Sequence, residues 1–506
     1  MIYSVGNNLG RKLTGIEKAM INRLNLFKKN SISNKLIFVS WSPRLYLHAQ
    51  LLKINQNDVF SLYDVLQDSL NVKEKYFNWI NYWENDCNYT LKYVVDTNDI
   101  KIYKNGLYKM YVHFVDSNYN ILDYINYFDI KQRKIRRDLY DTRGFLSCTK
   151  VLTTNQKVVM EQYYSPSKNV KFEKYYNPED KIPKVQSIIY YASDGIKFFE
   201  DNNSLLSFAI ETLYESGDLF LSDKNIKTSP IFNKCNIKIP VVAILHSTHV
   251  KNINNVYDSE IKNTYKPLFN NLTRYSGIIV STQQQKIDVS IRINNVIPVY
   301  TIPVGYTENS SFNNENKNLT DSNKIISIAR YSPEKQLEHQ IELISKLVKD
   351  FPSIQLHLYG FGNEQKKYET LIKNLNLENN VFLRGFIQDL DQEIETAYLS
   401  LITSKMEGFN LGLLETIAKG IPPIGYDSKY GPSDLIINKE NGFLISKNDK
   451  EKLYHCVKEL LYNVNLRNEF SKACKKHANN FNENKVIDKW QLFFKIYFRL
   501  ITTINS

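Results

Sequence analysis

The sequence lacks the marks of a membrane-spanning, secreted or disulfide-rich protein. No apolar run approaches the ~18 residues that a bilayer-spanning helix needs, and Met1–Leu13 has no hydrophobic core of the secretory kind. The five cysteines are widely spread and include no C-x-x-C pair, which argues against a disulfide framework and a zinc knuckle. We therefore expect a soluble, cytoplasmic protein with reduced cysteines and no transmembrane segment, with peripheral membrane association left open.

Two common phosphate-binding signatures are missing as well. There is neither a G-x-G-x-x-G dinucleotide fingerprint nor a G-x-x-x-x-G-K-S/T P-loop. No helix-turn-helix, zinc or RNA-recognition signature accompanies the basic residues, so we expect no nucleic-acid partner. What the sequence does have is an excess of positive charge, with 65 Lys and Arg against 53 Asp and Glu and a net charge of +12. Such an excess favours anionic partners and says nothing about fold.

Two stretches of α/β rhythm flank a β-rich stretch. Buried strands alternate with amphipathic helices before residue 73 and after residue 195, whereas short Tyr-, Val- and Ile-rich runs with turn signals such as Asn105-Gly106 lie between. We therefore predict an α/β protein with two Rossmann-like, doubly wound domains and an antiparallel β-rich insertion in the first. The predicted ranges are 1–72 and 196–307 for the N-terminal domain, 73–195 for the insertion, 308–485 for the C-terminal domain and 486–506 for a last helix. A polar stretch, 308–322, predicts the linker between the domains.

The sharpest motif is Glu407-x7-Glu415, which follows the predicted strand Leu399–Thr403. A loop with Gly408 enters a helix near Leu411, and backbone amides at a helix N-terminus bind anionic or hydroxyl-rich ligands. The two carboxylates are just over two helical turns apart, so they share a face if the helix covers both. One would then grip sugar hydroxyls and the other ribose hydroxyls. An ordinary loop and surface helix is the alternative.

Arg330 and Lys335 follow the predicted strand Lys324–Ala329, and Pro333 keeps their loop from being helical throughout. A guanidinium and an ammonium at the carboxyl end of a strand suit a diphosphate. Solvated surface charge is the alternative for a pair of cations alone.

Other polar groups follow other strands. His246 and His249 end the predicted strand Pro240–Leu245, where a histidine can bond a substrate hydroxyl. A metal is not expected there, because no third ligand is apparent nearby. The loop residues Gly15, Ile16, Glu17 and Lys18 follow the first strand, and a glycine lets backbone approach a phosphate closely.

The predicted insertion carries a basic run, which suits an anionic polymer or is simply a solvated face. Its members are Lys131, Arg133, Lys134, Arg136 and Arg137, with Arg143 beyond.

The combination resembles the retaining GT-B glycosyltransferases of glycosyltransferase family 4. Arg330 with Lys335, the Glu407-x7-Glu415 spacing and His246 after a strand occur in the family's order. The Tyr-rich insertion and residues 430–434 resemble a narrower branch, which contains the accessory-Sec adhesin O-GlcNAc transferases and the wall teichoic acid glycosyltransferases. Three stretches, 13–19, 246–249 and 329–336, are most similar to the staphylococcal enzymes that glycosylate serine–aspartate repeats of surface adhesins.

The resemblance implies transfer of N-acetylglucosamine from UDP-GlcNAc to serine hydroxyls of an acidic repeat, with retention of configuration and without a metal or other cofactor. It implies catalytic roles for His246, Arg330, Lys335 and Glu407. It implies donor-binding roles for Gly15, Ile16, Glu17, Lys18, His249, Phe386, Ile387, Gly408, Phe409, Asn410, Leu411 and Glu415. The basic run from Lys131 to Arg137 is then the expected acceptor-binding surface. The first loop has a single glycine where the broad family often has two, so we expect a different approach to the phosphates there.

Three alternatives stay open. The same chemistry on a teichoic acid polymer would suit a basic insertion equally well, and GlcNAc and glucose donors share these motifs. A non-catalytic GT-B partner of an active transferase is disfavoured by the intact Arg330, Lys335, Glu407 and Glu415. Exposed strands of the insertion could also pair edge to edge and give a homo-oligomer.

Overall fold

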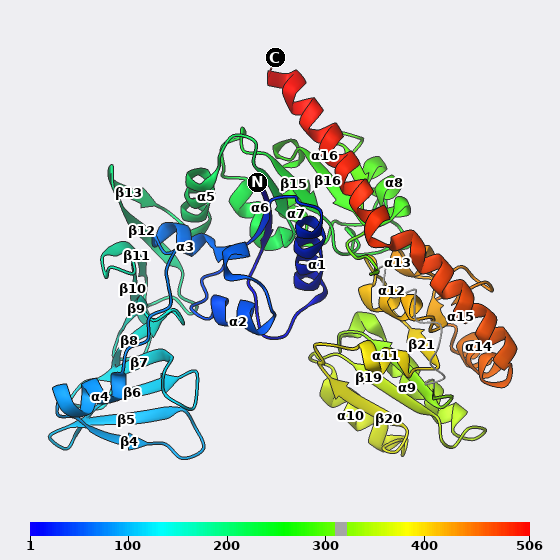
Figure 1. Cartoon of the computed structure of the whole chain (residues 1–506), viewed down its shortest axis with the longest axis horizontal. Helices are drawn as coiled ribbons and strands as arrows, with labels where there is room; N and C mark the ends of the chain where they lie inside the picture. Colours follow the sequence, from blue (N-terminus) through cyan, green and yellow to red (C-terminus); the bar gives the residue numbers. More distant parts are fainter. Residues whose placement is uncertain (309–320, 506) are drawn as a thin grey trace. The chain divides into compact units, whose positions relative to one another are not determined.

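The computed structural model describes residues 1–308 and 321–505 (Figure 1). The predicted linker at 308–322 therefore lies almost wholly outside the described residues. By its internal contacts the chain divides into two compact units. The first comprises Met1–Leu13 and Ser33–Val241, and the second comprises Thr14–Ile32 and Val242–Ser506. A short segment near the N-terminus thus belongs with the C-terminal half.

The first unit contains parallel strands of the predicted N-terminal α/β domain. They are neighbours in the order β14-β1-β2-β3, and every residue of β1 and β14 is buried, as in a sheet with both faces covered. The strands are β1 (Ile2–Gly6), β2 (Asn34–Phe38), β3 (Val59–Ser61) and β14 (Leu219–Ser222). The helices of this unit are α2 (Leu45–Leu51), α3 (Leu62–Leu66), α4 (Trp79–Asn81), α5 (Asn202–Leu213) and α6 (Asn225–Phe232).

A ten-stranded antiparallel sheet makes up the rest of the first unit and confirms the predicted β-rich insertion (Figure 1). Its strands follow chain order, β4 to β13, across the sheet. They are β4 (Thr90–Tyr93), β5 (Asp99–Lys104), β6 (Leu107–Phe114), β7 (Leu122–Phe128), β8 (Lys134–Tyr140), β9 (Leu146–Leu152), β10 (Val158–Tyr164), β11 (Val170–Tyr176), β12 (Val185–Ala192) and β13 (Gly195–Phe199). The Tyr-, Val- and Ile-rich runs of the sequence do not predict β8 or β13, and β13 runs past the predicted boundary at residue 195.

Strand β8 carries most of the basic run, which hides its strand character in the sequence. Its arginines lie over tyrosines of the neighbouring strand β7, with the Arg136 guanidinium 5.0 Å from the Tyr127 ring and that of Arg137 4.5 Å from the Tyr124 ring. Cation–π contacts and the long aliphatic stems let arginine cover an aromatic surface. The partner rings are remote in sequence, so the charged letters alone do not predict a strand.

Arg143 is a buried anchor rather than an outlying member of a basic surface, which corrects the expectation from the sequence. Its guanidinium bonds Asp141 at 2.8 Å, Asp64 at 2.7 Å and the Ser69 carbonyl at 2.6 Å. It also lies 3.8 Å from the centre of the Tyr46 ring. Because two carboxylates neutralise it inside the protein, Arg143 offers no charge to a partner and instead ties the insertion to the α/β part of its unit.

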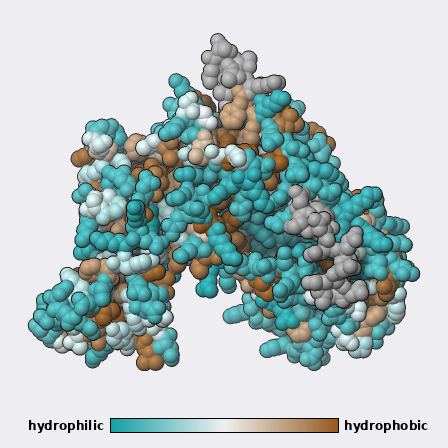
Figure 2. All heavy atoms as spheres, viewed as in Figure 1, coloured by the Kyte–Doolittle hydropathy of each residue, from teal (hydrophilic) through white to brown (hydrophobic). Residues whose placement is uncertain are grey.

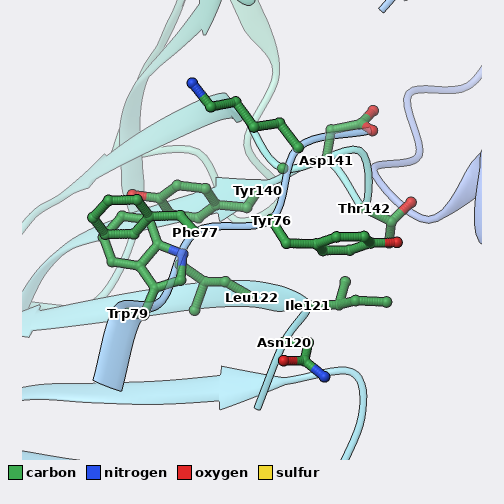
Figure 3. A pocket seen from close by; sticks show the side chains of 11 residues that line it. Tyr76, Phe77, Trp79, Asn120, Ile121, Leu122, Tyr140, Asp141 and Thr142 are labelled. Atoms are coloured by element: carbon green, nitrogen blue, oxygen red, sulfur yellow. The ribbon is translucent and has the colours of Figure 1, made fainter. Parts of the chain in front are cut away.

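The segment that leads into the insertion is joined to the anchor by its backbone, because the Lys75 N–H donates to the Arg143 carbonyl at 3.0 Å. Figure 3 shows aromatic side chains of this segment beside Tyr140, Asp141 and Thr142. Gly144 has φ of +96°, and a Cβ there would lie 1.8 Å from the Lys75 carbonyl oxygen, so only glycine fits. The ring of Trp79 lies 4.8 Å from that of Phe77 and 5.4 Å from that of Tyr140. The cavity between these elements has about 10 Å³ of free volume, which is room for about one water molecule and not for a substrate.

The second unit holds the C-terminal α/β domain and the strands β15 (Val241–Ile244), β16 (Gly277–Val280) and β17 (Val299–Thr301), which are parallel neighbours. Six parallel strands form its main sheet in the order β20-β19-β18-β21-β22-β23. They are β18 (Lys324–Ile328), β19 (Gln355–Tyr359), β20 (Val381–Gly385), β21 (Leu399–Ile402), β22 (Pro423–Tyr426) and β23 (Phe443–Ile445). The order reverses between β18 and β21, and ligands of such sheets bind beyond the carboxyl ends of the strands at that switch point.

Helices of the second unit cover its sheets and pack on one another. They are α1 (Gly15–Lys29), α7 (Lys266–Phe269), α8 (Gln283–Arg292), α9 (Leu337–Leu347), α10 (Gln365–Asn374), α11 (Asp391–Glu395), α12 (Leu411–Ala418), α13 (Gly431–Leu435), α14 (Lys450–Tyr462), α15 (Val464–Ala478) and α16 (Glu483–Asn505). The last helix was expected at 486–506, and α16 packs on α1 through the Phe27 ring, 5.1 Å from the ring of Trp490. No helix of the described residues is long and apolar enough to cross a membrane. On the face drawn in Figure 2, hydrophilic residues dominate.

Candidate active site

Residues that follow β15, β18 and β21 lie together in the second unit. The 3-10 turn Pro333–Lys335 follows β18, and the loop with Glu407 follows β21. Gly408 packs directly on the segment after β15, because a Cβ there would lie 2.2 Å from the His246 carbonyl oxygen. Three motifs that are far apart in the sequence therefore share one site at the switch point.

Lys335 and Glu407 form an ion pair at its centre. The Lys335 ammonium lies 2.5 Å from Glu407 Oε1, and their side chains are only 13% and 9% exposed. Glu407 Oε1 also accepts hydrogen bonds from the Ser404 hydroxyl at 2.6 Å and from the Asn410 amide at 3.1 Å. The Thr403 hydroxyl donates to the Lys335 carbonyl at 2.9 Å and fixes the turn that carries the lysine. The pair is thus held rigidly from both loops.

Asn410 determines where α12 begins. Its φ is +77°, and its side-chain oxygen accepts the Leu413 backbone N–H at 3.0 Å as an N-cap. The helix therefore starts at Leu411, so Glu407 lies in the preceding loop and only Glu415 lies on the helix. The two carboxylates do not share a helix face, contrary to one reading of their spacing.

Glu415 meets the segment that follows β1 in the sequence. The Lys18 ammonium lies 2.6 Å from Glu415 Oε1, with both side chains partly exposed. Glu17 caps helix α1, because its carboxylate accepts the Thr14 backbone N–H at 3.0 Å in a capping box. Gly15, the first residue of α1, is exposed, and Ile16 is partly buried beside it.

Arg330 extends from the same loop as Lys335 but is more open. Its side chain is 60% exposed and pairs with Glu334 at 2.7 Å. The Glu334 carbonyl in turn accepts the Lys405 backbone N–H at 2.8 Å, which joins the loop after β18 to the loop after β21. An exposed guanidinium with one partner can turn toward an incoming anion at small cost.

The two predicted histidines have different surroundings. His246 lies at the Gly408 contact, and its backbone N–H donates to the buried Tyr265 hydroxyl at 3.2 Å. His249 is fully buried, with its ring 5.9 Å from that of Phe269 and 6.5 Å from that of Tyr430 in nearly parallel stacks. Burial lowers the pKa of His249 to about 4, so the ring is neutral. The donor-binding role predicted for His249 remains a prediction.

The remaining donor-site predictions fall on apolar contacts. The Phe386 ring, just after β20, lies 5.8 Å from that of Phe361, and Ile387 packs against a small buried cluster of the same domain. Phe409 is buried 5.6 Å from the Phe481 ring. Leu411 fills the space beside Gly305, where a Cβ would lie 2.2 Å from a Leu411 methyl.

Sequence reasoning missed Lys262, a partly buried lysine in the segment between β15 and α7. Its ammonium lies 2.5 Å from the Thr248 hydroxyl and 3.0 Å from the Met406 sulfur, beside Glu407. No motif surrounds it in the sequence, and only the fold brings it to this position.

The predicted acceptor surface lies in the first unit and is more neutral than its sequence suggests. Arg133 pairs with Asp129 at 2.7 Å, and Arg136 pairs with the buried Asp138 at 2.7 Å. Arg137 donates to the Asn126 amide oxygen at 2.7 Å. Burial lowers the pKa of Lys134, and Lys131 is exposed. The acceptor role of this surface stays a prediction.

Comparisons with known proteins agree with the predicted fold. Residues 309–477 match the family model described as "Glycosyl transferases group 1". The chain is 27% identical over 379 residues to poly(glycerol-phosphate) alpha-glucosyltransferase of Bacillus subtilis (strain 168), a match that covers 72% of this chain and 55% of that protein. It is 25% identical over 531 residues to the UDP-N-acetylglucosamine–peptide N-acetylglucosaminyltransferase GtfA subunit of Streptococcus agalactiae, with 98% of each chain covered.

A solved structure covers the whole architecture. The pneumococcal O-GlcNAc transferase GtfA, crystallised in complex with UDP and GlcNAc, superposes with a TM-score of 0.83 at 20% identity and covers 98% of this chain and 99% of that one. The fold is therefore GT-B with an antiparallel β-rich insertion, as predicted. The family match falls in the C-terminal half, where the switch-point site lies. The chain spans little more than half of the length of the Bacillus protein.

Proposed function

We propose that this chain transfers N-acetylglucosamine from UDP-GlcNAc to serine hydroxyls of serine–aspartate repeats, with retention at the anomeric carbon. The observation that carries the proposal is the joining of Arg330, Lys335 and Glu407 in one half-buried site at the sheet's switch point. The named relatives support it, since one acts as a UDP-N-acetylglucosamine–peptide transferase by its name.

The two cations would act on the leaving diphosphate. Departure of UDP places negative charge on the β-phosphate, and fixed positive groups that meet developing charge lower the barrier. Lys335 is preorganised by Glu407 and the Thr403 bond, so it needs little movement. Arg330, more exposed, would complete the clamp by leaving Glu334.

The carboxylates would bind hydroxyl groups. Glu415 lies on α12 and pairs with Lys18 of α1. Glu415 would hold the ribose, and Lys18 would lie close to the phosphates. Glu407 and the amides of Gly408, Phe409 and Asn410 would face the donor sugar. His246, at the Gly408 contact, would lie near the reaction centre. Attack would come from the front side of the sugar, with the departing phosphate taking the serine proton.

The acceptor assignment rests on charge. A serine–aspartate repeat carries a negative charge at every second residue, and a net charge of +12 steers such a chain toward the protein at low salt. Among the described residues, Lys131, Lys134 and Arg137 of the predicted acceptor surface form no ion pair with a carboxylate. Burial lowers the pKa of Lys134, so Lys131 and Arg137 are the stronger candidates. They would meet the aspartates directly.

A second candidate is the same transfer to a polymer of alditol phosphates. The name of the Bacillus relative specifies a poly(glycerol-phosphate) acceptor, whose phosphates would suit the same basic surface. A non-catalytic role as partner of another transferase is the third possibility. The intact Lys335–Glu407 and Lys18–Glu415 pairs disfavour it, because a chain without turnover needs neither.

One experiment that compares two acceptors separates these functions. The chain is incubated with UDP-GlcNAc and either a Ser-Asp repeat peptide or purified teichoic acid, and UDP release is measured. Intact-mass gains of whole HexNAc units on the peptide are expected. Turnover on teichoic acid alone would refute the peptide acceptor, and UDP binding without turnover on either would point to the non-catalytic role. An α-anomeric coupling in the NMR spectrum of the product checks retention.

A further inference from the structure

Lys262 is held against the candidate active site by both backbone and side chain. Its backbone N–H donates to the His249 carbonyl at 2.9 Å, and the preceding Ile261 forms a bridge with Val250. The segment is thereby fastened to the loop that follows β15. The side chain then extends to the Thr248 hydroxyl and the Met406 sulfur. Two loops of the site therefore hold its ammonium in place.

The ammonium has only uncharged partners. The Thr248 hydroxyl at 2.5 Å and the Met406 sulfur at 3.0 Å accept from it, and it forms no ion pair with any carboxylate of residues 1–308 or 321–505. A partly buried cation without a counter-ion is costly, because protein replaces the water that would solvate it. Burial accordingly lowers the pKa of Lys262 to about 8.

The charges around Lys262 are those of the proposed diphosphate clamp. Glu334 and Glu407 raise its pKa, whereas Lys335 and Arg330 lower it, so two charges of each sign oppose one another and burial dominates. Both carboxylates already have cationic partners of their own, Arg330 and Lys335 respectively. An additional anion is therefore the group that would stabilise the charged form of Lys262.

We propose that Lys262 is a third phosphate-binding cation of the site, whose missing counter-ion is the diphosphate of the nucleotide donor. This inference rests on the proposed function, since it takes the same bound nucleotide as its ligand. A phosphate fits better than an acceptor carboxylate, because the Lys262 ammonium contacts Met406, the residue before Glu407, and Glu407 pairs with Lys335 of the proposed diphosphate clamp. Without the nucleotide, the Lys262 ammonium donates to the Thr248 hydroxyl and the Met406 sulfur. Binding of the diphosphate stabilises the protonated form of the lysine.

The test compares UDP affinity by calorimetry in the full chain and in K262Q, K262R and K405Q. Lys405 is the matched control, because its exposed side chain precedes Met406 and carries the same charge. K262Q should weaken UDP binding roughly 10- to 100-fold, the loss typical of a charge-assisted hydrogen bond. K262R and K405Q should stay near the parent value. Uridine, which has no phosphate, should bind the parent and K262Q equally well.

The pH dependence gives a second readout that a merely structural lysine would not produce. Raising the pH from 7 to 9 deprotonates a lysine of pKa about 8, so UDP binding by the parent should weaken by about tenfold. UDP binding by K405Q should weaken over the same pH range, whereas UDP binding by K262R should not, because arginine stays charged. UDP affinity that is equal in K262Q and the parent would overturn the inference, as would an equal loss for uridine. Absence of UDP binding by the parent would instead overturn the proposed function itself.

Discussion

Removal of the Lys335 charge should destabilise the folded protein, and removal of its partner should restore stability without restoring activity. The K335M variant leaves Glu407 as a carboxylate that is 9% exposed and has no counter-ion at 2.5 Å. Breaking a buried pair by removing one partner costs about 3–5 kcal/mol. Glu407 keeps its bonds from Ser404 and Asn410, so we expect about 3 kcal/mol, the lower end of that range.

The double variant K335M/E407Q removes the stranded charge. A glutamine oxygen can still accept from Ser404 and Asn410, and replacing both members of a buried pair is often neutral or stabilising. We therefore expect the double variant to regain most of the ~3 kcal/mol lost in K335M. Turnover should remain at least about 100-fold below the parent in both, because the diphosphate has lost a fixed cation.

Urea unfolding followed by circular dichroism measures the free energy of unfolding, and UDP release measures turnover. The control is K450M, which breaks the Lys450–Glu342 pair, with a 2.6 Å separation but side chains 43% and 40% exposed; it should cost less than about 1 kcal/mol. If K335M loses no more free energy of unfolding than K450M, or if the double variant is as unstable as K335M, the Lys335–Glu407 pair is not a buried, desolvated ion pair. Recovery of turnover in the double variant would refute the role of Lys335 at the diphosphate.

Three other variants and one treatment test different parts of the same structure. G408A should lower turnover by about 100-fold, because its Cβ would lie 2.2 Å from the His246 carbonyl oxygen and a shift of ~1 Å in a site is that costly; G10A, whose Cβ meets nothing closer than 3.7 Å, should behave like the parent. His249 has a pKa lowered to about 4, so between pH 7 and pH 5 the unfolded chain binds a proton at this residue and the folded chain does not. The free energy of unfolding therefore decreases as the pH is lowered. From pH 7 to pH 5 this loss should be about 2 kcal/mol larger in the parent than in H249F, as measured by urea unfolding at both pH values. The double variant K131Q/R137Q should raise the KM for a Ser-Asp repeat peptide several-fold with UDP affinity unchanged, and equal peptide KM values would refute the acceptor surface. Treatment with EDTA should leave turnover unchanged if Arg330 and Lys335 carry the charge of the diphosphate, and loss of activity that Mg²⁺ restores would contradict this.

The parallel strands could be predicted because their buried residues form short uninterrupted apolar runs. Strands β18 and β21 were expected at 324–329 and 399–403 and lie at Lys324–Ile328 and Leu399–Ile402. Since cations and carboxylates follow these two strands, the sequence also indicated which loops meet. It also predicted a helix that begins near Leu411, as α12 does. It did not predict that Asn410 would cap this helix in a left-handed conformation, because such backbone at a non-glycine residue leaves no periodic signal.

Charged residues inside the fold were the part that the sequence could not resolve. Lys262 and Arg143 are ordinary basic letters with no apolar pattern around them, yet one lies against the Met406 sulfur and the other between Asp64 and Asp141. Asp141 and Thr248 are near in the chain, but Met406 and Asp64, on which the two positions also depend, are more than 70 residues away from Lys262 and Arg143 respectively. A residue's charge is visible in a sequence, but its solvation is decided only by tertiary packing.

Solvation also changes what the excess of positive charge can do. Steering of a distant anion depends on the net charge of +12, which pairing on the surface does not alter. Binding at contact depends instead on cations without a carboxylate partner. Two of the five members of the basic run, Arg133 and Arg136, fail that condition because they are paired, and the nearby Arg143 is buried between two carboxylates. Lys262 meets this condition inside the site, and Lys131, Lys134 and Arg137 meet it among the described residues of the insertion. The same total charge therefore serves encounter over long range, while a few unpaired groups decide which anion is held.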